Sequence, residues 1–120
     1  MKKILLADDE RNLRMLVHTT LEDAEYQILE AANGTEALEM AKKEKPDLLV
    51  LDWMMPGLSG IEVAKLLRED PETANIPIIM LTAKGQERDR EKGQSIGAYA
   101  YLLKPFSPLQ LLEKVKDALR

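Results

Sequence analysis

Five polar residues at the ends of short apolar runs carry side chains that can act together chemically. They provide three carboxylates, one hydroxyl and one ammonium: Asp8, Asp9, Asp52, Thr82 and Lys104. Clustered carboxylates repel one another unless a cation lies among them, and hard divalent ions such as Mg²⁺ or Mn²⁺ prefer oxygen ligands. With the charge neutralised, Asp52 can attack phosphorus and form an aspartyl phosphate. Lys104 can supply a further cation, and Thr82 can donate its hydroxyl to a phosphoryl oxygen.

Four apolar runs, typical of buried strands, must position these residues. They are residues 4–7, 48–51, 78–81 and 100–103, separated by stretches long enough for helices. Strands that alternate with helices form a parallel sheet, whose carboxyl ends all lie along one edge. The sequence therefore predicts that the five polar side chains converge at that edge. Taken singly, they have simpler interpretations: the acidic pair or Thr82 as a helix cap, and Lys104 as a surface charge.

Further patterns predict the remaining elements. A strand is expected around residues 27–31, and a helix is expected before it, after Asn33, after Gly60 and from Ser107. Asn33 and Ser107 are of the types that cap helices, and Pro108 suits the first helical position. Apolar residues at helical spacing predict the buried face of the first helix: Leu13, Leu16, Val17, Leu21 and Ala24.

Residues 84–95 depart from this pattern because they contain no apolar side chain, and Gly85 and Gly93 interrupt them. A fourth helix there has little to anchor it to the sheet. We expect either a loosely packed solvated helix or a segment of low stability that moves when the site changes state. The complete pattern predicts an α/β fold with a five-stranded parallel sheet and five helices on both of its faces.

Length and charge narrow the class of protein. The 120 residues, 45% of them hydrophobic, suit one domain with a core. Because 17 basic and 21 acidic residues give a net charge of -4 without a basic block, direct nucleic acid binding is not expected. No run approaches the roughly 18 apolar residues of a membrane span, and no secretion signal precedes the first strand, so we expect a cytoplasmic protein. The absence of cysteine excludes disulfides and thiolate catalysis.

The combination of motifs resembles the receiver domain of two-component response regulators, from Ile4 to Leu119. The matching pieces are Asp8-Asp9, Asp52 with Pro56 and Gly60, Thr82-Ala83, and Lys104-Pro105-Phe106. The resemblance implies one receiver domain over residues 1–120. It also implies a flavodoxin-like three-layer α/β/α fold with strand order 2-1-3-4-5.

The same resemblance implies a role for each site residue. Asp52 would accept a phosphoryl group from the phosphohistidine of a sensor histidine kinase or phosphotransfer protein. Mg²⁺ would be held by Asp9, Asp52 and the main-chain carbonyl of Met54, with Asp8 acting through water. Lys104 would pair with the Asp52 carboxylate and then with the phosphoryl group.

A switch is implied as well. Thr82 would be drawn toward the phosphoryl group, and Tyr101 would rotate into the space it leaves. The surface formed by the segment after Thr82, the last strand and the last helix would then report phosphorylation to a downstream protein or an output domain. Lys104-Pro105 would be a cis peptide. Met54 and Lys84 would border the path of an attacking water, and Met54 offers no group to orient it, so slow autodephosphorylation is expected.

One departure from the family bears on oligomeric state. Receiver domains of winged-helix transcription factors usually carry two acids just before the aromatic switch residue, and they use these acids in salt bridges across a dimer. This chain has Tyr99 and Ala100 there. We therefore expect a mostly monomeric protein that regulates by binding another protein. His18 is expected to be a solvated residue of the first helix and not a phosphoryl carrier.

Three other functions compete with the phosphoacceptor hypothesis. A phosphatase with an aspartate nucleophile usually needs a second acid where this chain has Met54. A flavin mononucleotide carrier shares the fold, but Asp8-Asp9-Glu10 would repel its phosphate. A receiver that serves only as a phosphorylation-independent docking module stays open as the alternative. In either receiver hypothesis the chain is a switch or an adaptor, without turnover of an external substrate as its main role.

Overall fold

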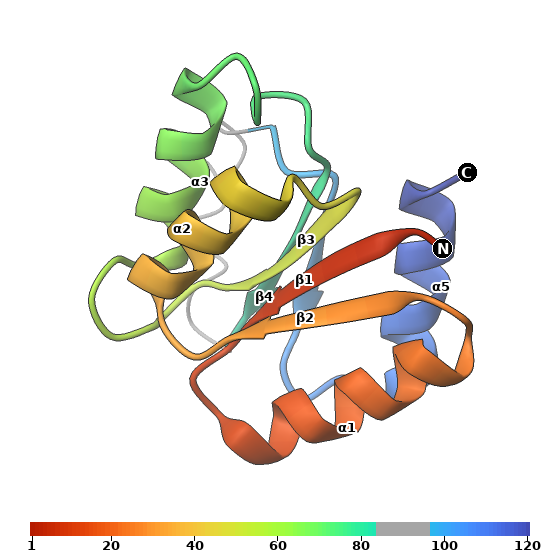
Figure 1. Ribbon diagram of the computed structural model, residues 1–120. Helices are drawn as coiled ribbons and strands as arrows, with labels where there is room; N and C mark the ends of the chain where they lie inside the picture. Colours follow the sequence, from red (N-terminus) through yellow and green to blue (C-terminus); the bar gives the residue numbers. More distant parts are fainter. Residues whose placement is uncertain (84–96) are drawn as a thin grey trace.

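The computed structural model describes residues 1–83 and 97–120 (Figure 1). Its strands are β1 (Lys3–Ala7), β2 (Gln27–Ala31), β3 (Leu48–Asp52), β4 (Ile78–Thr82) and β5 (Ala100–Leu103). Its helices are α1 (Arg11–Asp23), α2 (Gly34–Glu44), α3 (Gly60–Glu69) and α5 (Pro108–Ala118). The fourth helix expected from the sequence falls on residues 84–96, outside the described part of the chain.

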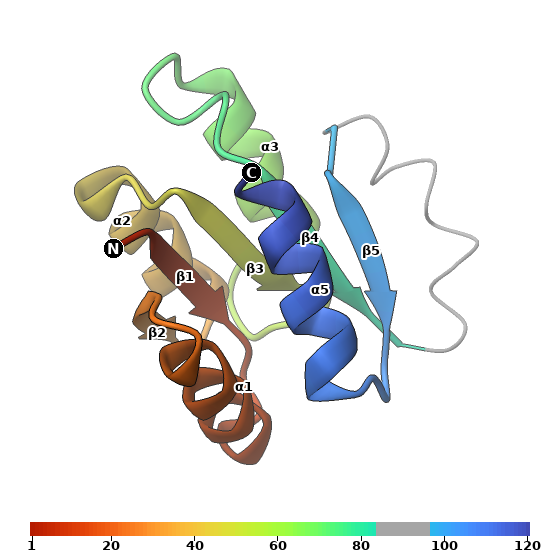
Figure 2. The ribbon, with the colours of Figure 1, turned by 90° about the vertical axis from the view of Figure 1, so that its right-hand side faces the viewer.

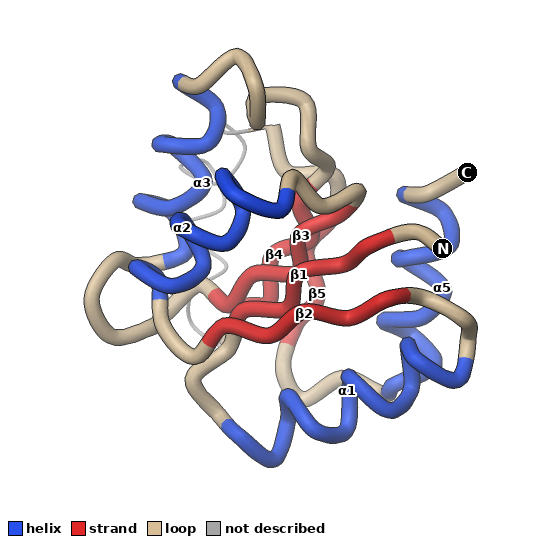
Figure 3. The backbone as a smooth tube through the Cα atoms, in the orientation of Figure 1, coloured by secondary structure: helices blue, strands red, loops and turns tan. Residues whose placement is uncertain are grey.

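The five strands form one parallel sheet in the order β2-β1-β3-β4-β5, which confirms the predicted fold class and strand order. Helices α2 and α3 pack on one face, and α1 and α5 pack on the other. The tube drawing shows the sheet as the middle of three layers (Figure 3). From the side, α5 crosses one face of the sheet, with β5 at its edge (Figure 2).

Strand β3 shows why its sequence is continuously apolar. Leu48 and Val50 belong to the core beneath α1 and α5, whereas Leu49 and Leu51 belong to the core beneath α2 and α3. All four side chains are fully buried, as expected for a parallel strand covered on both faces. Each such side chain contributes about 2 kcal/mol through removal of apolar surface from water. The centre of the sheet is therefore a rigid support for the residues at its carboxyl edge.

The predicted caps are confirmed at two helices. Asn33 Oδ1 accepts the backbone N–H of Glu36 at 2.9 Å. Ser107 and Gln110 bond reciprocally at the start of α5, which also begins with Pro108. The sequence interpretation did not identify the similar cap of α3, where Ser59 pairs with Glu62. Within the described residues, no helix is long and apolar enough to cross a membrane.

The predicted buried face of α1 is wrong at Leu16, which is 50% exposed. Val17 and Leu21 are fully buried, and Leu13 packs partly against the same core. These three residues repeat every four positions and form one stripe, whereas Leu16 precedes Val17 and lies about 100° away around the helix. The stripe that contacts the sheet is thus narrower than the apolar pattern indicated.

Candidate phosphoryl-acceptor site at the sheet edge

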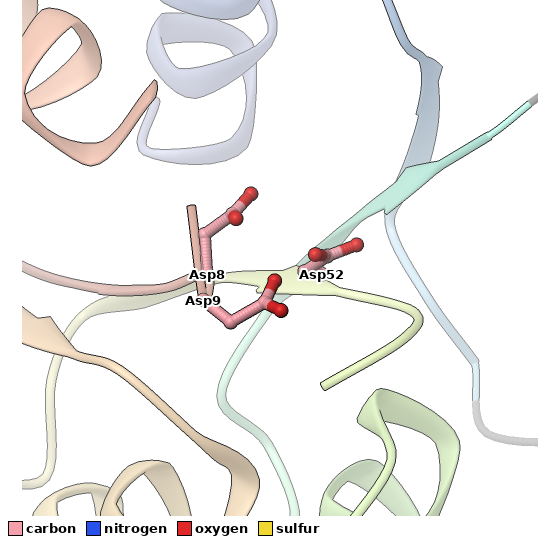
Figure 4. A group of neighbouring side chains, drawn as sticks. All are labelled: Asp8, Asp9 and Asp52. Carbon is pink, nitrogen blue, oxygen red and sulfur yellow. The ribbon is translucent and has the colours of Figure 1, made fainter. Parts of the chain in front are cut away.

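Three carboxylates meet at the carboxyl edge of the sheet (Figure 4). Asp8 and Asp9 follow β1, and Asp52 is the last residue of β3. One oxygen from each side chain lies within 4.8 Å of the other two. Asp8 and Asp52 are buried, whereas Asp9 is exposed. The arrangement is therefore a cluster of negative charge that opens to solvent on the side of Asp9.

Strand register explains the meeting of residues that are distant in the chain. Ala7 lies beside Leu51 in the β1–β3 ladder, so the residues that follow each of them emerge together. The chain then turns away from Asp52 through Trp53, whose carbonyl accepts the N–H of Gly60 at 2.9 Å. A Cβ atom on Gly60 would lie 2.2 Å from the main-chain oxygen of Asp52. Glycine at this position therefore allows the start of α3 to pack directly against the site.

Lys104 brings a positive charge into the cluster from the loop after β5. Its Nζ lies 2.9 Å from Asp8 Oδ2 and 3.2 Å from Asp52 Oδ2. Burial acts to lower the pKa of Lys104, but the hydrogen bonds and charges of Asp8 and Asp52 outweigh it, so the pKa is raised. The ammonium is thus held in its charged form between two acids. The Lys104-Pro105 peptide bond is cis.

Asp52 differs electrostatically from an ordinary aspartate. Burial, followed by the charge of Asp8, raises the pKa of Asp52 to about 6, although Lys104 acts in the opposite direction. A cation beside this carboxylate would favour its ionised, nucleophilic form. The donor set of three carboxylates fits a hard divalent ion with oxygen ligands, such as Mg²⁺.

The buried hydroxyl of Thr82 is a second feature that indicates a ligand site. Thr82 ends β4, next to Leu81, which lies beside Asp52 in the β3–β4 register. Its hydroxyl oxygen is buried and has no hydrogen-bond partner among the residues that the structure describes. Buried hydroxyl groups are normally bonded. An acceptor oxygen of a bound phosphoryl group would satisfy this one.

The other residues expected from the sequence lie around this centre. Tyr101, on β5, packs partly against the core beneath α2 and α3, and its hydroxyl oxygen is buried. Met54 directly follows Trp53 and is 60% exposed. Lys84 lies outside the described residues. The structure thus brings Asp8, Asp9, Asp52 and Lys104 together, and Met54 follows Asp52 by two residues.

The sequence interpretation missed a charged network behind the acidic loop. Arg14 donates to the main-chain oxygen of Asp8 at 2.7 Å and to Glu30 Oε1 at 3.1 Å. His18, expected to be solvated, is instead hydrogen-bonded to both Glu30 and Glu22, at 2.6 Å and 3.0 Å. The spacing of Arg14 and His18, four residues apart on one helix, was the available signal.

Comparison with known proteins agrees with this geometry. Residues 4–116 match the model of the response regulator receiver domain, and the chain belongs to this family. The resemblance drawn from the sequence motifs is thus confirmed. Receiver domains of response regulators are signalling modules and not enzymes that turn over an external substrate.

Particular relatives show how far the similarity extends. The phosphate regulon transcriptional regulatory protein PhoB of Pseudomonas aeruginosa is 49% identical over 119 residues, covering 99% of this chain and 52% of PhoB. The alkaline phosphatase synthesis regulator PhoP of Bacillus subtilis is 48% identical, covering 99% and 49%. The chain thus spans about half the length of these curated relatives. The structure of the chemotaxis response regulator CheY4 of Vibrio cholerae matches with a TM-score of 0.93 and 37% identity, covering 99% of each chain.

Proposed function

We propose that this chain is the phosphoacceptor switch of a two-component signalling system, with Asp52 as the acceptor. The observation that carries the proposal is the position of the Asp52 carboxylate, between two further aspartates and the ammonium of Lys104. The phosphoryl donor would be the phosphohistidine of a sensor histidine kinase or phosphotransfer protein. Because such a donor faces the cytoplasm, we place the protein there.

Asp9, Asp52 and the main-chain carbonyl of Met54 would hold Mg²⁺, or Mn²⁺ in its place. The bound ion would supply positive charge that offsets the repulsion between the carboxylates and the phosphoryl oxygens. The Asp8 carboxylate already accepts the N–H of Glu10 and pairs with Lys104, which suits a role through water. Asp9 is the exposed member of the cluster and suits direct ligation.

In the transfer step an oxygen of ionised Asp52 forms a bond to phosphorus. The bond between phosphorus and the donor imidazole nitrogen breaks, and its electron pair stays with that nitrogen. Lys104 and the hydroxyl of Thr82 stabilise the charge on the phosphoryl oxygens, as preorganised donors do in other phosphoryl transfers. Met54 offers no group to orient water for hydrolysis of the aspartyl phosphate, in which the phosphoryl group passes to water and the Asp52 carboxylate is restored. Slow autodephosphorylation follows from this, with Lys84 as a second residue that would set the rate.

A hollow beside the site suits the docking of the donor. It has a volume of about 280 Å³ and lies between the start of α1 and the loop after β5. Its lining combines apolar and charged side chains: Glu10, Leu13, Lys104, Pro105 and Phe106. A helix of the donor seated there would lie beside Lys104, whose ammonium contacts the Asp52 carboxylate. The lining therefore supports docking through α1 and the loop after Lys104.

The test is a phosphotransfer measurement with Mg²⁺ and acetyl phosphate, read out by intact mass and by Trp53 fluorescence. Trp53 is buried next to Asp52 and is the chain's single tryptophan. We expect the mass of one phosphoryl group and a Mg²⁺-dependent fluorescence change. Asp52→Asn should lose the mass increase entirely, whereas the exposed Asp23→Asn should retain it. A wild-type chain without any mass increase would favour the phosphorylation-independent docking module.

The output surface would comprise the segment after Thr82, β5 and α5. Phosphorylation would draw Thr82 toward the site and fix Tyr101 inward, changing the surface seen by a downstream protein or an output domain. We expect Tyr101→Ala to reduce the response of target binding to phosphorylation about tenfold, within the usual range of coupling between sites. Titration of the target with phosphorylated and unphosphorylated chain measures this. An unchanged ratio of the two affinities would exclude Tyr101 from the switch.

A further inference from the structure

Arg14 lies behind the acidic loop and contacts its main chain. The guanidinium leaves α1 and donates through Nη1 to the carbonyl oxygen of Asp8, at 2.7 Å. Through Nε it donates to Glu30 Oε1 on β2, at 3.1 Å. The Arg14 side chain is only 16% exposed, so it is fixed between a helix, a strand and the loop.

The bond to the Asp8 carbonyl bears directly on Asp9. That carbonyl and the N–H of Asp9 share one planar peptide unit, so fixing the oxygen fixes the orientation of the whole unit. The preceding peptide is held as well, because the N–H of Asp8 donates to the oxygen of Ala31 at 3.2 Å. Since the Asp9 side chain is exposed, its direction depends on the main chain from which it leaves.

Glu30 in turn holds the guanidinium. Its Oε1 accepts from Arg14, and its Oε2 lies 2.6 Å from His18 Nδ1. The other ring nitrogen of His18 lies 3.0 Å from Glu22. Burial acts to lower the pKa of His18, but the hydrogen bonds and charges of Glu30 and Glu22 outweigh it and raise the pKa. Glu30 is thus held through both of its oxygens, by Arg14 and by His18.

We propose that Arg14 is a positioning residue for the metal site, which orients the Asp8–Asp9 peptide while Glu30 holds its guanidinium in place. This inference rests on the proposed function, in which Asp9 is a metal ligand. This positioning role requires the planar guanidinium of arginine. One of its nitrogens donates to the Asp8 carbonyl oxygen, and a separate one donates to the Glu30 carboxylate. Lysine would keep the charge but has a single nitrogen.

Electrostatics alone predicts the opposite result, which makes the inference testable. Removing a cation near a Mg²⁺ site should strengthen Mg²⁺ binding, because the remaining positive charge repels the ion. Loss of positioning should weaken it. For Arg14→Gln we expect binding weaker by about tenfold to a hundredfold, the usual loss when a group that orients a metal ligand is removed. Arg14→Lys should also weaken binding, and Glu30→Gln should do so to a smaller extent.

The experiment is a Mg²⁺ titration of Trp53 fluorescence in these three variants and in Arg11→Gln, together with ¹⁵N NMR of the metal-free proteins. Arg11 is an exposed cation on the same helix, so its variant is the control for charge. We expect Arg11→Gln to bind Mg²⁺ as tightly as the wild type, or more tightly. The amide signals of Asp9 should shift in both Arg14 variants and not in Arg11→Gln.

The outcomes separate this inference from the proposed function. Wild-type chain that binds Mg²⁺, with Arg14→Gln and Arg14→Lys that bind it equally well or better, would overturn the role of Arg14 alone. Wild-type chain that does not bind Mg²⁺ would overturn the proposed function and the metal-site role with it. If Arg14→Gln does not fold, Arg14→Lys decides, because it keeps the positive charge and removes only the contact made by two separate nitrogens.

Discussion

Replacement of Lys104 by methionine is expected to destabilise the metal-free chain by about 3 kcal/mol at neutral pH. The ammonium pairs with the carboxylates of Asp8 and Asp52, which are buried. Methionine has a similar length but no charge, so it would leave both acids without this partner in a region of restricted solvation. Urea unfolding of the variant and the wild type in the presence of a chelator measures the difference.

The destabilisation should depend on pH and on Mg²⁺. The destabilisation should diminish in acid, because protonation of the carboxylates removes the negative charge that the Lys104 ammonium neutralises at neutral pH. Mg²⁺ should also restore much of the lost stability, and the variant should bind the ion more tightly because a competing cation is gone. Lys116→Met, at an exposed position of α5, is the matched control and should change stability by less than about 0.5 kcal/mol. Equal unfolding curves for Lys104→Met and Lys116→Met would contradict the structural role of the ammonium.

Most of the site could be predicted because parallel-sheet topology leaves few alternatives. Once residues 4–7 and 48–51 are identified as neighbouring buried strands, Asp8, Asp9 and Asp52 must emerge at the same edge. Lys104 follows another apolar run, residues 100–103, and should emerge at that edge for the same reason. In the structure its ammonium donates hydrogen bonds to the carboxylates of Asp8 and Asp52. The family motifs supplied the strand order that periodicity alone did not.

Other features depend on contacts between elements, which the sequence indicated at most through the spacing of Arg14 and His18 on α1. The bond from Arg14 to Asp8 has a main-chain oxygen as its acceptor, and every residue offers one of those. His18 was expected to be solvated because it lies on the polar side of the helix pattern, and that pattern does not show its partner Glu30, which lies on a strand. The exposure of Leu16 follows from the narrow contact between α1 and the sheet, and the apolar pattern of the helix does not define this width. Such features follow from packing between elements and not from local pattern.

Replacement of Asp52 by asparagine is expected to stabilise the metal-free chain at neutral pH. Burial and the charge of Asp8 raise the pKa of Asp52 to about 6 in the folded chain, from 3.8. The folded state therefore holds this proton more tightly than the unfolded state does. As the pH rises from about 4 to about 6, the unfolded chain releases the proton first, and stability is lost across that window. The full loss of stability from ionising Asp52 is present above about pH 6, and none of it is present below about pH 4.

Asparagine cannot ionise, so the variant avoids this cost. We expect a gain of about 2 to 3 kcal/mol at pH 7, which corresponds to the shift from 3.8 to about 6, a value that already includes the opposing effect of Lys104. The gain should disappear near pH 4, and urea unfolding across this range in the presence of a chelator measures it. Asp23→Asn, at an exposed position of α1, should show no such pH dependence. A gain of equal size at pH 4 and pH 7 would mean that packing, and not ionisation, is responsible.

The two substitutions should also interact, since Lys104 contacts the Asp52 carboxylate directly at 3.2 Å. Lys104→Met leaves two buried acids in the wild-type background but only Asp8 in the Asp52→Asn background. The loss of stability caused by Lys104→Met should therefore be smaller by about 1 kcal/mol or more in the Asp52→Asn background. Such a difference in a double-mutant cycle is expected for residues in direct contact. Additive effects would show that the ammonium is held by Asp8 alone. A large coupling would show that the ammonium of Lys104 interacts with the Asp52 carboxylate as well as with Asp8.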